Sequence, residues 1–375
     1  MERATELALI DELRDLDAAG EKFLDETVAA SPVDRYTSAE RFALERERLF
    51  ARVPAIVATS AELDGPGAFL RVELAGRALL LTRDREGAVH AFANACRHRG
   101  ARLVDDASGC RHRFSCPYHA WTYSNAGDLL AVPHEAAGFP GLDKATRGLR
   151  RYGCTERDGL IWVSLAGPDA PDVEHWLAGL APDLAQYDLG SLAPFAVEDL
   201  DLAVNWKILV EGGIEAYHFK VAHRKTIAPL FLDNLSSYQS FGPHLRSVLP
   251  RTTLTELAPE ARDGWDLRAH ANLVYTVLGT TQFLVQEDHV VRIQLEPLAA
   301  DRTRARLATL VPVDHPAPEH YWQRHHDFTL TTLREDFALG EGIQAGLAQA
   351  EEPLLFGRYE GALDAFNRAV DDCIA

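Results

Sequence analysis

Several kinds of segment are absent from this chain of 375 residues. No apolar run approaches the roughly 20 residues that a membrane-spanning helix needs. Basic residues number 38 against 56 acidic ones, and the resulting formal net charge of −18 argues against nucleic acid as a partner. The first residues are charged and amphipathic, which is not the pattern of a secretory signal. We therefore expect neither a membrane nor a nucleic-acid partner.

Cysteine is scarce as well. Two of the five cysteines belong to the motifs described below, which leaves Cys110, Cys154 and Cys373. An odd remainder suits free thiols in a reducing cytoplasm better than a disulfide framework. With 47% hydrophobic and 25% charged residues, the chain can bury a large core without disulfides, and its length fits two domains.

Two short cysteine–histidine pairs stand out among the residues that are present. Cys96 and His98 form the first pair, and Cys116 and His119 form the second after 17 intervening residues. Two cysteines on one iron and two histidines on the other make up the ligand set of a Rieske [2Fe–2S] centre, in which neutral imidazole raises the reduction potential. A structural zinc site is the alternative, although zinc sites more often use Cys-x2–4-Cys and His-x3–5-His pairs.

A second candidate site lies in the stretch NWKILVEGGIEAYHFKVAH, residues 205–223. Glu215 precedes His218 by three positions, so the two share a face of a helix. His218 and His223 are five positions apart, a rotation of about 140° on a straight helix. They can bind one ion only if the helix bends, bulges or breaks between them. By itself this histidine pair is weak evidence for a metal site.

Both sites together resemble the Rieske non-haem iron oxygenases, from about residue 50 to the end of the chain. The stretches CRHRGARL (96–103) and CPYHAWTYSNAGDLLAVPHE (116–135) are similar to the family's CxHRG and CxxHGW loops, and 205–223 is similar to NWK…EN…(D/E)xYHxxxxH. The resemblance implies that His218 and His223 bind mononuclear Fe(II), with a carboxylate completing a triad that leaves positions open for O2. The segment 333–347 resembles the family's late acidic segment, so we expect Asp336 as the third ligand, with Glu335 and Glu341 as fallbacks.

The chain departs from the family pattern in two places. Ala120 stands where the family usually has glycine, and Gly212 stands where it usually has asparagine after Glu211. The glycines at 212 and 213 can permit close backbone approach or the required bend. Ala101 and Tyr118 occupy the positions of the extra cysteines found in respiratory Rieske proteins. The resemblance therefore implies an oxygenase-type cluster, reduced with NAD(P)H through a reductase.

Glu215 has a separate role in this resemblance. The family places an acidic residue there to link the mononuclear site to a cluster histidine of the neighbouring subunit, because a carboxylate can accept a hydrogen bond from each metal-bound imidazole. Such a bridge implies a closed ring of subunits, most simply a homotrimer.

The substrate is less well defined. Glutamate at 215, in place of the aspartate common among ring dihydroxylating enzymes, resembles the branch that oxidises betaines, choline and carnitine. We therefore expect monooxygenation of a small quaternary ammonium compound, including N-demethylation, with some aromatic residues forming a cation–π cage. The aromatic candidates are Trp206, Tyr217, Phe219, Phe231, Tyr238, Phe241, Trp265, Tyr275 and Phe283.

The alternative is hydroxylation, dihydroxylation or O-demethylation of an aromatic acid. This reading requires an arginine in the pocket to hold the carboxylate, and the available residues are Arg246, Arg251 and Arg292. Two other classes stay open: a Rieske electron carrier without mononuclear iron, and a structural zinc protein.

Basic residues crowd the cluster loops of this acidic chain. They can dock a flavin- or ferredoxin-type reductase, or equally contact the neighbouring subunit. They are Arg97, Arg99, Arg102, Arg111 and Arg113.

The pattern of short β-rich and helical runs predicts an α+β protein. We expect N-terminal helices over 1–49, a small antiparallel β domain carrying the cluster over 50–166, and a larger catalytic domain over 167–375. In the larger domain an antiparallel sheet is covered by helices, a helix-grip-like arrangement. Expected helices span 1–30, a segment starting near Thr37, 173–188, 205–225, 318–349 and 359–373.

Overall fold

The computed structural model describes residues 1–375 and divides into two compact units. The smaller unit contains 50–176 and 188–191, and the larger contains 1–49, 177–187 and 192–375. The smaller unit thus extends past the expected boundary at 166. Gly153 holds this extension, because its N–H donates to the Gly167 carbonyl and a Cβ at Gly153 would lie 1.9 Å from the Asp169 oxygen.

The smaller unit is built from antiparallel strands. One sheet has the order β2-β11-β10-β5-β4-β3-β6, and the other has the order β7-β8-β9. The strands are β2 (Ala55–Thr59), β3 (Ala68–Leu74), β4 (Arg77–Arg83), β5 (Val89–Ala93), β6 (Ser108–Cys110), β7 (Arg113–Ser115), β8 (Thr122–Ser124), β9 (Leu129–Ala131), β10 (Arg151–Arg157) and β11 (Leu160–Ser164). Two short helices follow in this part of the chain, α4 (Glu135–Gly138) and α5 (Val173–Leu177).

Strand β4 separates two parts of this unit's core. Because successive side chains of a strand point to opposite faces, Leu79 and Leu81 pack on one side and Leu80 on the other. Leu80 belongs to the cluster that also contains Cys96 and Cys116. The two cysteines of the motifs therefore pack in a hydrophobic core, which fixes their positions.

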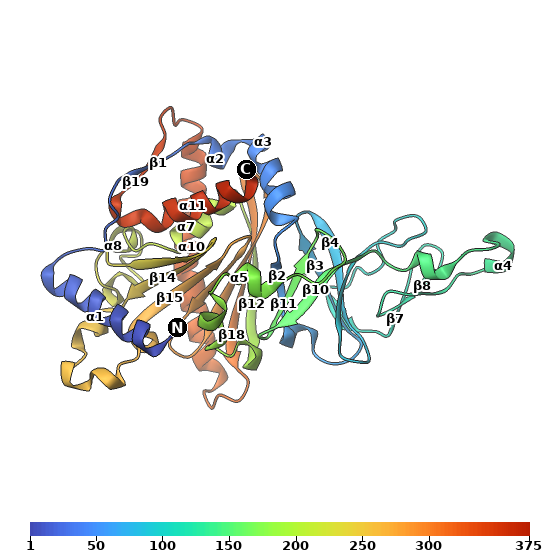
Figure 1. The fold of residues 1–375 in the computed structure, drawn as a ribbon, viewed down its shortest axis with the longest axis horizontal. Coiled ribbons are helices and arrows are strands. Elements are labelled where there is room, and N and C mark those ends of the chain that lie inside the picture. The colour runs from blue at the N-terminus through green and yellow to red at the C-terminus, as the bar shows by residue number, and fades with distance from the viewer. The chain divides into compact units, whose positions relative to one another are not determined.

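The larger unit contains a seven-stranded antiparallel sheet of order β12-β18-β17-β16-β15-β14-β13. Its strands are β12 (Leu192–Leu202), β13 (Ser237–Phe241), β14 (His244–Pro250), β15 (Ala271–Val277), β16 (Thr281–Val285), β17 (Val290–Ala299) and β18 (Arg302–Pro312), and a separate pair is formed by β1 (Ala29–Ser31) and β19 (Leu354–Phe356). Its helices are α1 (Arg3–Ala19), α2 (Asp34–Thr37), α3 (Ala39–Leu44), α6 (Ala181–Ala185), α7 (Trp206–Gly212), α8 (Phe219–Ala222), α9 (Leu267–His270), α10 (Glu319–Leu347) and α11 (Gly361–Ile374) (Figure 1). The expected α+β class, a small antiparallel unit and a larger helix-covered sheet, is confirmed.

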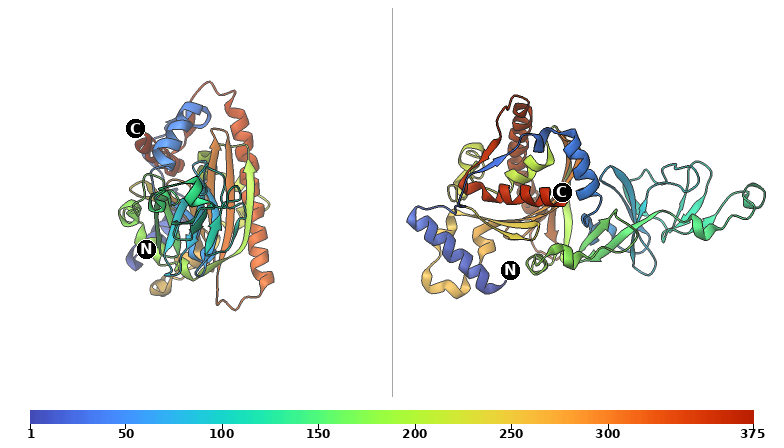
Figure 2. Two further views of the ribbon diagram at one scale, coloured as in Figure 1. Left: turned by 90° about the vertical axis from the view of Figure 1, so that its right-hand side faces the viewer. Right: turned by 45° about the horizontal axis from the view of Figure 1, so that its top comes forward.

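The long helix α10 runs along one face of the large sheet (Figure 2). Two hydrogen bonds tie it there: Gln286 Nε2 donates to Thr329 Oγ1 at 3.1 Å, and Thr309 Oγ1 lies 2.9 Å from His326 Nδ1. None of the helices combines the length and the apolar character that crossing a membrane requires.

Among the expected helices, the first is shorter, the second begins one residue later and the third is broken. The helix expected over 1–30 ends at Ala19, because Gly20 adopts a left-handed conformation (φ 69°) and its N–H bonds the Asp17 carbonyl. The second helix is capped by Ser38 instead of Thr37, since the Ser38 hydroxyl accepts from the Arg41 N–H. The helix expected over 173–188 divides into α5 and α6.

The helix expected over 205–225 is also interrupted. It divides into α7 and the single turn α8, and α7 ends where Gly213 follows Gly212. Asn205 caps the start of α7 by accepting from the Lys207 N–H.

Glu211 in α7 makes folding stability depend on pH. It is buried, and its Oε1 accepts from the Tyr36 hydroxyl at 2.8 Å and from Asn367 Nδ2 at 2.7 Å. Burial raises the pKa of Glu211 to about 7, although these hydrogen bonds and Lys207 act in the opposite direction. Between about pH 4.5 and 7 the folded chain therefore holds a proton that the unfolded chain releases, so stability falls as pH rises.

Glu211→Gln is expected to remove this pH dependence, because a neutral amide keeps the acceptor oxygen without the ionisable group. The difference in unfolding free energy between wild type and variant should change by about 2–3 kcal/mol from pH 5 to pH 8. Urea unfolding at both pH values measures it. A pH-independent difference would contradict the assignment of the buried proton to Glu211.

Candidate functional site

The two loops that carry the cysteine–histidine pairs have the same backbone geometry. In the first loop the Gly100 N–H bonds the Cys96 carbonyl at 2.9 Å, and in the second the Ala120 N–H bonds the Cys116 carbonyl at 2.9 Å. Both closing residues have left-handed backbones, with φ 76° at Gly100 and 55° at Ala120. The loops therefore present their side chains as a matched pair.

In these loops the thiols point inward and the imidazoles outward. Cys96 and Cys116 are each 4% exposed, whereas His119 is exposed and its ring centroid lies 4.9 Å from that of the half-buried His98. All five cysteines of the chain are free. Burial raises the pKa of the Cys96 thiol, so thiolate at this position requires a metal or another positive group.

The four side chains supply the donor set of a two-iron cluster. Two buried thiols and two outer imidazoles match the ligands of a Rieske centre, one pair for each iron. The Tyr123 hydroxyl, which accepts from the Arg97 N–H at 3.0 Å, lies 3.3 Å from Cys96 Sγ. Sequence reasoning missed Tyr123, because only the fold brings it to the thiol.

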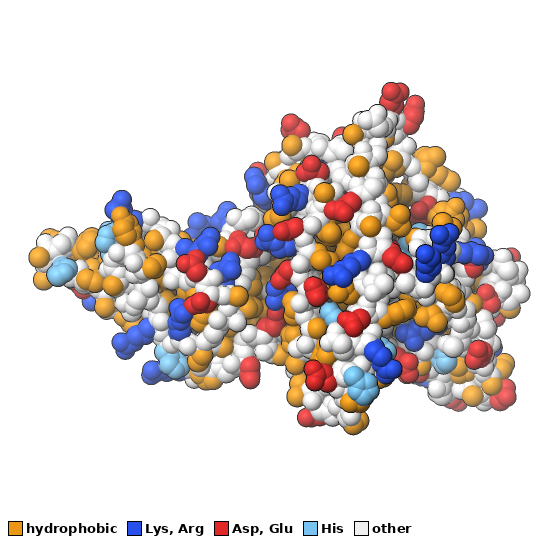
Figure 3. Space-filling model, turned by 180° about the vertical axis from the view of Figure 1, so that it is seen from behind, with side chains coloured by type: hydrophobic (Ala, Val, Ile, Leu, Met, Phe, Trp, Pro, Cys, Tyr) orange, Lys and Arg blue, Asp and Glu red, His pale blue; other side chains and the backbone are white.

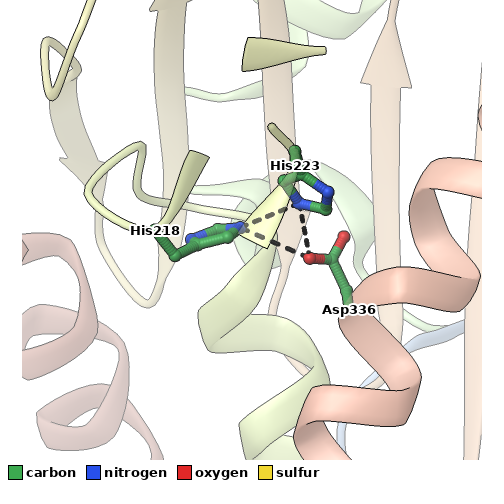
Figure 4. Close-up of side chains that lie close together, drawn as sticks. All are labelled: His218, His223 and Asp336. Atoms are coloured by element: carbon green, nitrogen blue, oxygen red, sulfur yellow. Dashed lines mark hydrogen bonds and ion pairs between the residues drawn. The ribbon is translucent and has the colours of Figure 1, made fainter. Parts of the chain in front are cut away.

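In the larger unit, His218, His223 and Asp336 converge on one point (Figure 4). Asp336 Oδ1 lies 2.7 Å from His223 Nε2 and 3.3 Å from His218 Nε2, and the two Nε2 atoms are 3.2 Å apart. Two imidazoles and one carboxylate on one side of an ion are the facial triad of non-haem iron enzymes. The donor set therefore fits mononuclear Fe(II).

The end of α8 at His223 allows this convergence. His218 and His223 occupy the two ends of α8, and the His223 N–H bonds the Phe219 carbonyl at 3.0 Å. His223 has already left helical geometry (φ −103°, ψ 25°), so its ring does not follow the 140° rotation of a straight helix. Asp336 projects from α10 toward both rings.

Carboxylates orient both imidazoles by hydrogen bonds to their Nδ1 atoms. His218 Nδ1 bonds Glu215 Oε1, and His223 Nδ1 lies 2.8 Å from Glu335 Oε2, which also accepts from the Thr226 hydroxyl at 2.6 Å. Each ring is thus held with Nε2 toward the centre. Burial lowers the pKa of His218, but Asp336 and Glu215 outweigh it and raise the pKa to about 10, so the site favours positive charge.

Glu335 and Glu341, the two alternatives to Asp336 as the third ligand, have other partners. Glu335 orients His223, and sequence reasoning missed this role and that of Thr226. Neighbouring positions on a helix point about 100° apart, which separates Glu335 from Asp336. Glu341 Oε1 accepts from the Ala203 N–H at 2.8 Å and so lies outside the triad.

A cavity of about 590 Å³ begins at His223 and Asp336. Gly212 lines it, and a Cβ there would meet nothing within 4 Å, whereas a Cβ at Gly213 would lie 3.1 Å from Gln282 Oε1. The missing asparagine side chain therefore leaves space beside the triad, and Gly213 permits close approach to strand β16.

Most of the aromatic residues considered for a cation–π cage lie elsewhere. Phe219 and Phe231 line the cavity, whereas Tyr275 pairs its hydroxyl with Tyr187 and Tyr238 bonds Asp25. Among the three arginines, Arg246 is paired with Asp183 and Arg292 is fully buried, and Arg251 lines the cavity.

Two protein-family descriptions match this chain. The ring hydroxylating alpha subunit (catalytic domain) matches residues 189–375, and the Rieske [2Fe-2S] domain matches residues 53–152. Together they cover both sites described above.

Characterised relatives are similar over part of their length. The glycine betaine monooxygenase oxygenase subunit of Chromohalobacter salexigens is 32% identical over 207 residues, which are 55% of this chain and 45% of that protein. The anthranilate 1,2-dioxygenase large subunit of Acinetobacter baylyi is 32% identical over 195 residues, 51% and 41% of the two chains. The chain thus spans less than half of either relative in these matches.

Solved structures share the fold. A quaternary ammonium Rieske monooxygenase in complex with L-carnitine superposes with a TM-score of 0.79 at 22% identity, over 92% of this chain and 96% of that one. Naphthalene 1,2-dioxygenase from a Rhodococcus species gives a TM-score of 0.77 at 19% identity, over 100% and 98%.

Ala120→Gly is expected to stabilise the smaller unit by about 0.5–1 kcal/mol. Glycine removes the cost of a side chain in the left-handed region, about 1–2 kcal/mol, and part of this gain is offset by the greater flexibility of the unfolded chain. Denaturant unfolding measures the change. Ala107→Gly, at an exposed alanine without a positive φ, is the control and should destabilise. Equal destabilisation by both variants would contradict this account.

Asp336→Asn is expected to lose the mononuclear iron and to keep the iron and acid-labile sulfide of the cluster. Glu335→Gln, which removes only the orienting carboxylate, should weaken mononuclear iron binding by about 10–100-fold without abolishing it. Iron and sulfide analysis after controlled loading distinguishes the two. Undiminished iron in Asp336→Asn would exclude Asp336 as a ligand.

Proposed function

This chain belongs to the Rieske non-haem iron oxygenases, as a catalytic alpha subunit, and on that premise we propose that it is the terminal oxygenase of a multicomponent hydroxylating system. In the reaction, a substrate C–H bond becomes C–OH, the second oxygen atom of O2 leaves as water, and two electrons and two protons are consumed. The convergence of His218, His223 and Asp336, the last two of which line a mainly apolar cavity, carries the proposal.

Two sets of residues would hold the metals. Cys96, His98, Cys116 and His119 would hold a [2Fe–2S] cluster, and the three converging residues would hold Fe(II). When bound, the cluster supplies single electrons and the mononuclear iron supplies an open coordination face for O2. A Rieske electron carrier would not need the second site, so the converging triad favours the oxygenase.

The protein's own side chains prepare the reaction site. Glu215 and Glu335 fix the ring orientation of His218 and His223, so the ligand atoms are in place before any ion arrives. The apolar wall beside the triad excludes water from the substrate.

Glu215 is also suited to link two subunits. Its carboxylate holds His218 and is buried, whereas Tyr217, two residues further on, is half exposed, so the segment that carries Glu215 reaches the surface. On the smaller unit, His119 is exposed. A cluster histidine from a second copy could therefore donate to Glu215, which gives electrons a short route and makes a homotrimer the simplest closed assembly.

A reductase is the expected electron donor. The five arginines of the cluster loops are exposed, and basic side chains gather on the smaller unit in Figure 3. An acidic ferredoxin or flavin reductase fits this surface, as does an acidic part of a neighbouring subunit. Reduction by the reductase should slow in high salt if the arginines dock it.

Two substrate classes have support. Glu215 and the betaine-oxidising relative favour a small quaternary ammonium compound. The cavity, with Arg251 and without tyrosine or tryptophan in its lining, favours an acid with an apolar body.

Oxygen uptake by iron-loaded protein with a generic reductase tests the proposal, with betaines, carnitine, choline and aromatic acids as substrates. Uptake coupled to a hydroxylated product is expected for one class. Glu215→Gln should keep cluster reduction but lower coupled uptake by at least about tenfold, because the bridging carboxylate is lost. Full uptake in this variant would remove Glu215 from the electron route. Iron-loaded, reducible protein with no coupled uptake for either class would contradict the proposal.

A further inference from the structure

The cavity has an apolar wall that leads away from the metal triad. The Phe219 ring lies 5.6 Å from the His223 ring and 5.3 Å from the Phe231 ring, and the Phe231 backbone is bridged to that of Arg251. Further apolar side chains line the cavity: Leu249, Val274, Leu284, Ile293 and Leu333. Phe219 and Phe231 therefore form a row that leads from His223 to the backbone segment of Arg251.

The spacing of the lining residues along the chain indicates how long the cavity is. Gln282 and Gln286 both line it, and four residues of extended chain span about 14 Å. Gln286 bonds Thr329, which lies seven residues before Asp336 on α10, about 10 Å. The cavity thus extends on the order of 10 Å from the triad to its polar end.

Arg251 is the positive group at that end. Its Nη2 donates to Asn272 Oδ1 at 2.8 Å, and its Nη1 lies 3.7 Å from Glu287 Oε2, which is beyond hydrogen-bond distance. The Glu287 side chain is 65% exposed, whereas that of Arg251 is 22% exposed. Burial lowers the pKa of Arg251, and Glu287 and Asp288 offset this only in part. The nearby carboxylates therefore do not fully neutralise the positive charge of Arg251, and its guanidinium can bind a further anion.

From this geometry we propose that the substrate is an elongated apolar carboxylic acid, with Arg251 holding its carboxylate and the far end of its apolar body lying at the triad. This inference rests on the proposed function and adds the substrate class. Arg251 is a specificity-determining residue, because a guanidinium can bind a carboxylate through two parallel hydrogen bonds. The reaction would hydroxylate the apolar end, with O2 and reductase-derived electrons as co-reactants.

The cavity argues against small quaternary ammonium compounds. A volume of about 590 Å³ lies in the range of cavities that enclose drug-sized ligands, and glycine betaine would leave most of it unfilled. Glu256 and Glu287 also line the cavity, and Glu287 lies 3.7 Å from the Arg251 guanidinium. The only benzene-ring side chains of the lining are phenylalanines, and the tyrosine and tryptophan faces that bind cations best are absent from it.

Calorimetric binding to the iron-loaded protein, without reductase or O2, tests the inference independently of turnover. The probes are biphenyl-4-carboxylate, its methyl ester, benzoate and glycine betaine. Biphenyl-4-carboxylate should bind at least about tenfold more tightly than its ester, the difference expected for a charge-assisted hydrogen bond. It should also bind more tightly than benzoate or glycine betaine.

Arg251→Gln should abolish the preference for acid over ester, and Arg251→Lys should keep part of it, because lysine retains the charge without the planar fork. Arg302→Gln, at an exposed arginine of β18, is the charge-matched control and should leave the preference unchanged. Equal binding of acid and ester by wild type, no binding of the acid, tighter binding of glycine betaine, or an unchanged preference in Arg251→Gln would each overturn the inference. Failure of turnover with normal acid binding would instead count against the proposed function.

Discussion

The geometry of the larger unit depends on the interruption of one helix. A continuous helix from 206 to 223 would point His218 and His223 in different directions, and one ion could not bind both. The two glycines after Glu211 end α7, and the short turn α8 then holds one histidine at each end. Because His223 leaves helical geometry at the end of α8, Asp336 on α10 meets both rings, although it lies more than a hundred residues away in the chain.

The same interruption connects the metal site to its surroundings. Glu215 lies in the linking segment and holds His218, while Phe219 in α8 begins the apolar wall of the cavity. Gly213 lets this segment approach Gln282 of the sheet closely, and Gly212 leaves open space beside the triad. Ligand position, imidazole orientation and cavity shape are therefore consequences of one local backbone conformation, supported by α10 and the sheet.

Parts of the fold followed from local patterns and parts did not. The helices expected near 318–349 and 359–373 are present as α10 and α11, because apolar periodicity over many residues identifies a helix well. The predicted first helix, residues 1–30, is longer than the observed one, because the left-handed turn at Gly20 was not recognised in the sequence. The positive φ at Ala120, which stands where the family usually has glycine, was likewise not predicted from the sequence.

The sequence by itself determined the kinds of chemistry available to this protein. The cysteine–histidine pairs are recognised by residue type and spacing, because metals select their ligand atoms. The histidine–carboxylate set was expected only through the resemblance to a known family. Only the tertiary structure showed that Glu335 orients an imidazole while Asp336, expected from the resemblance, faces both rings, since the two are neighbours in the chain but point in different directions on α10. Tertiary structure also selected Arg251 among three arginines, because strand register and helix packing decide which side chains line a cavity formed by distant segments.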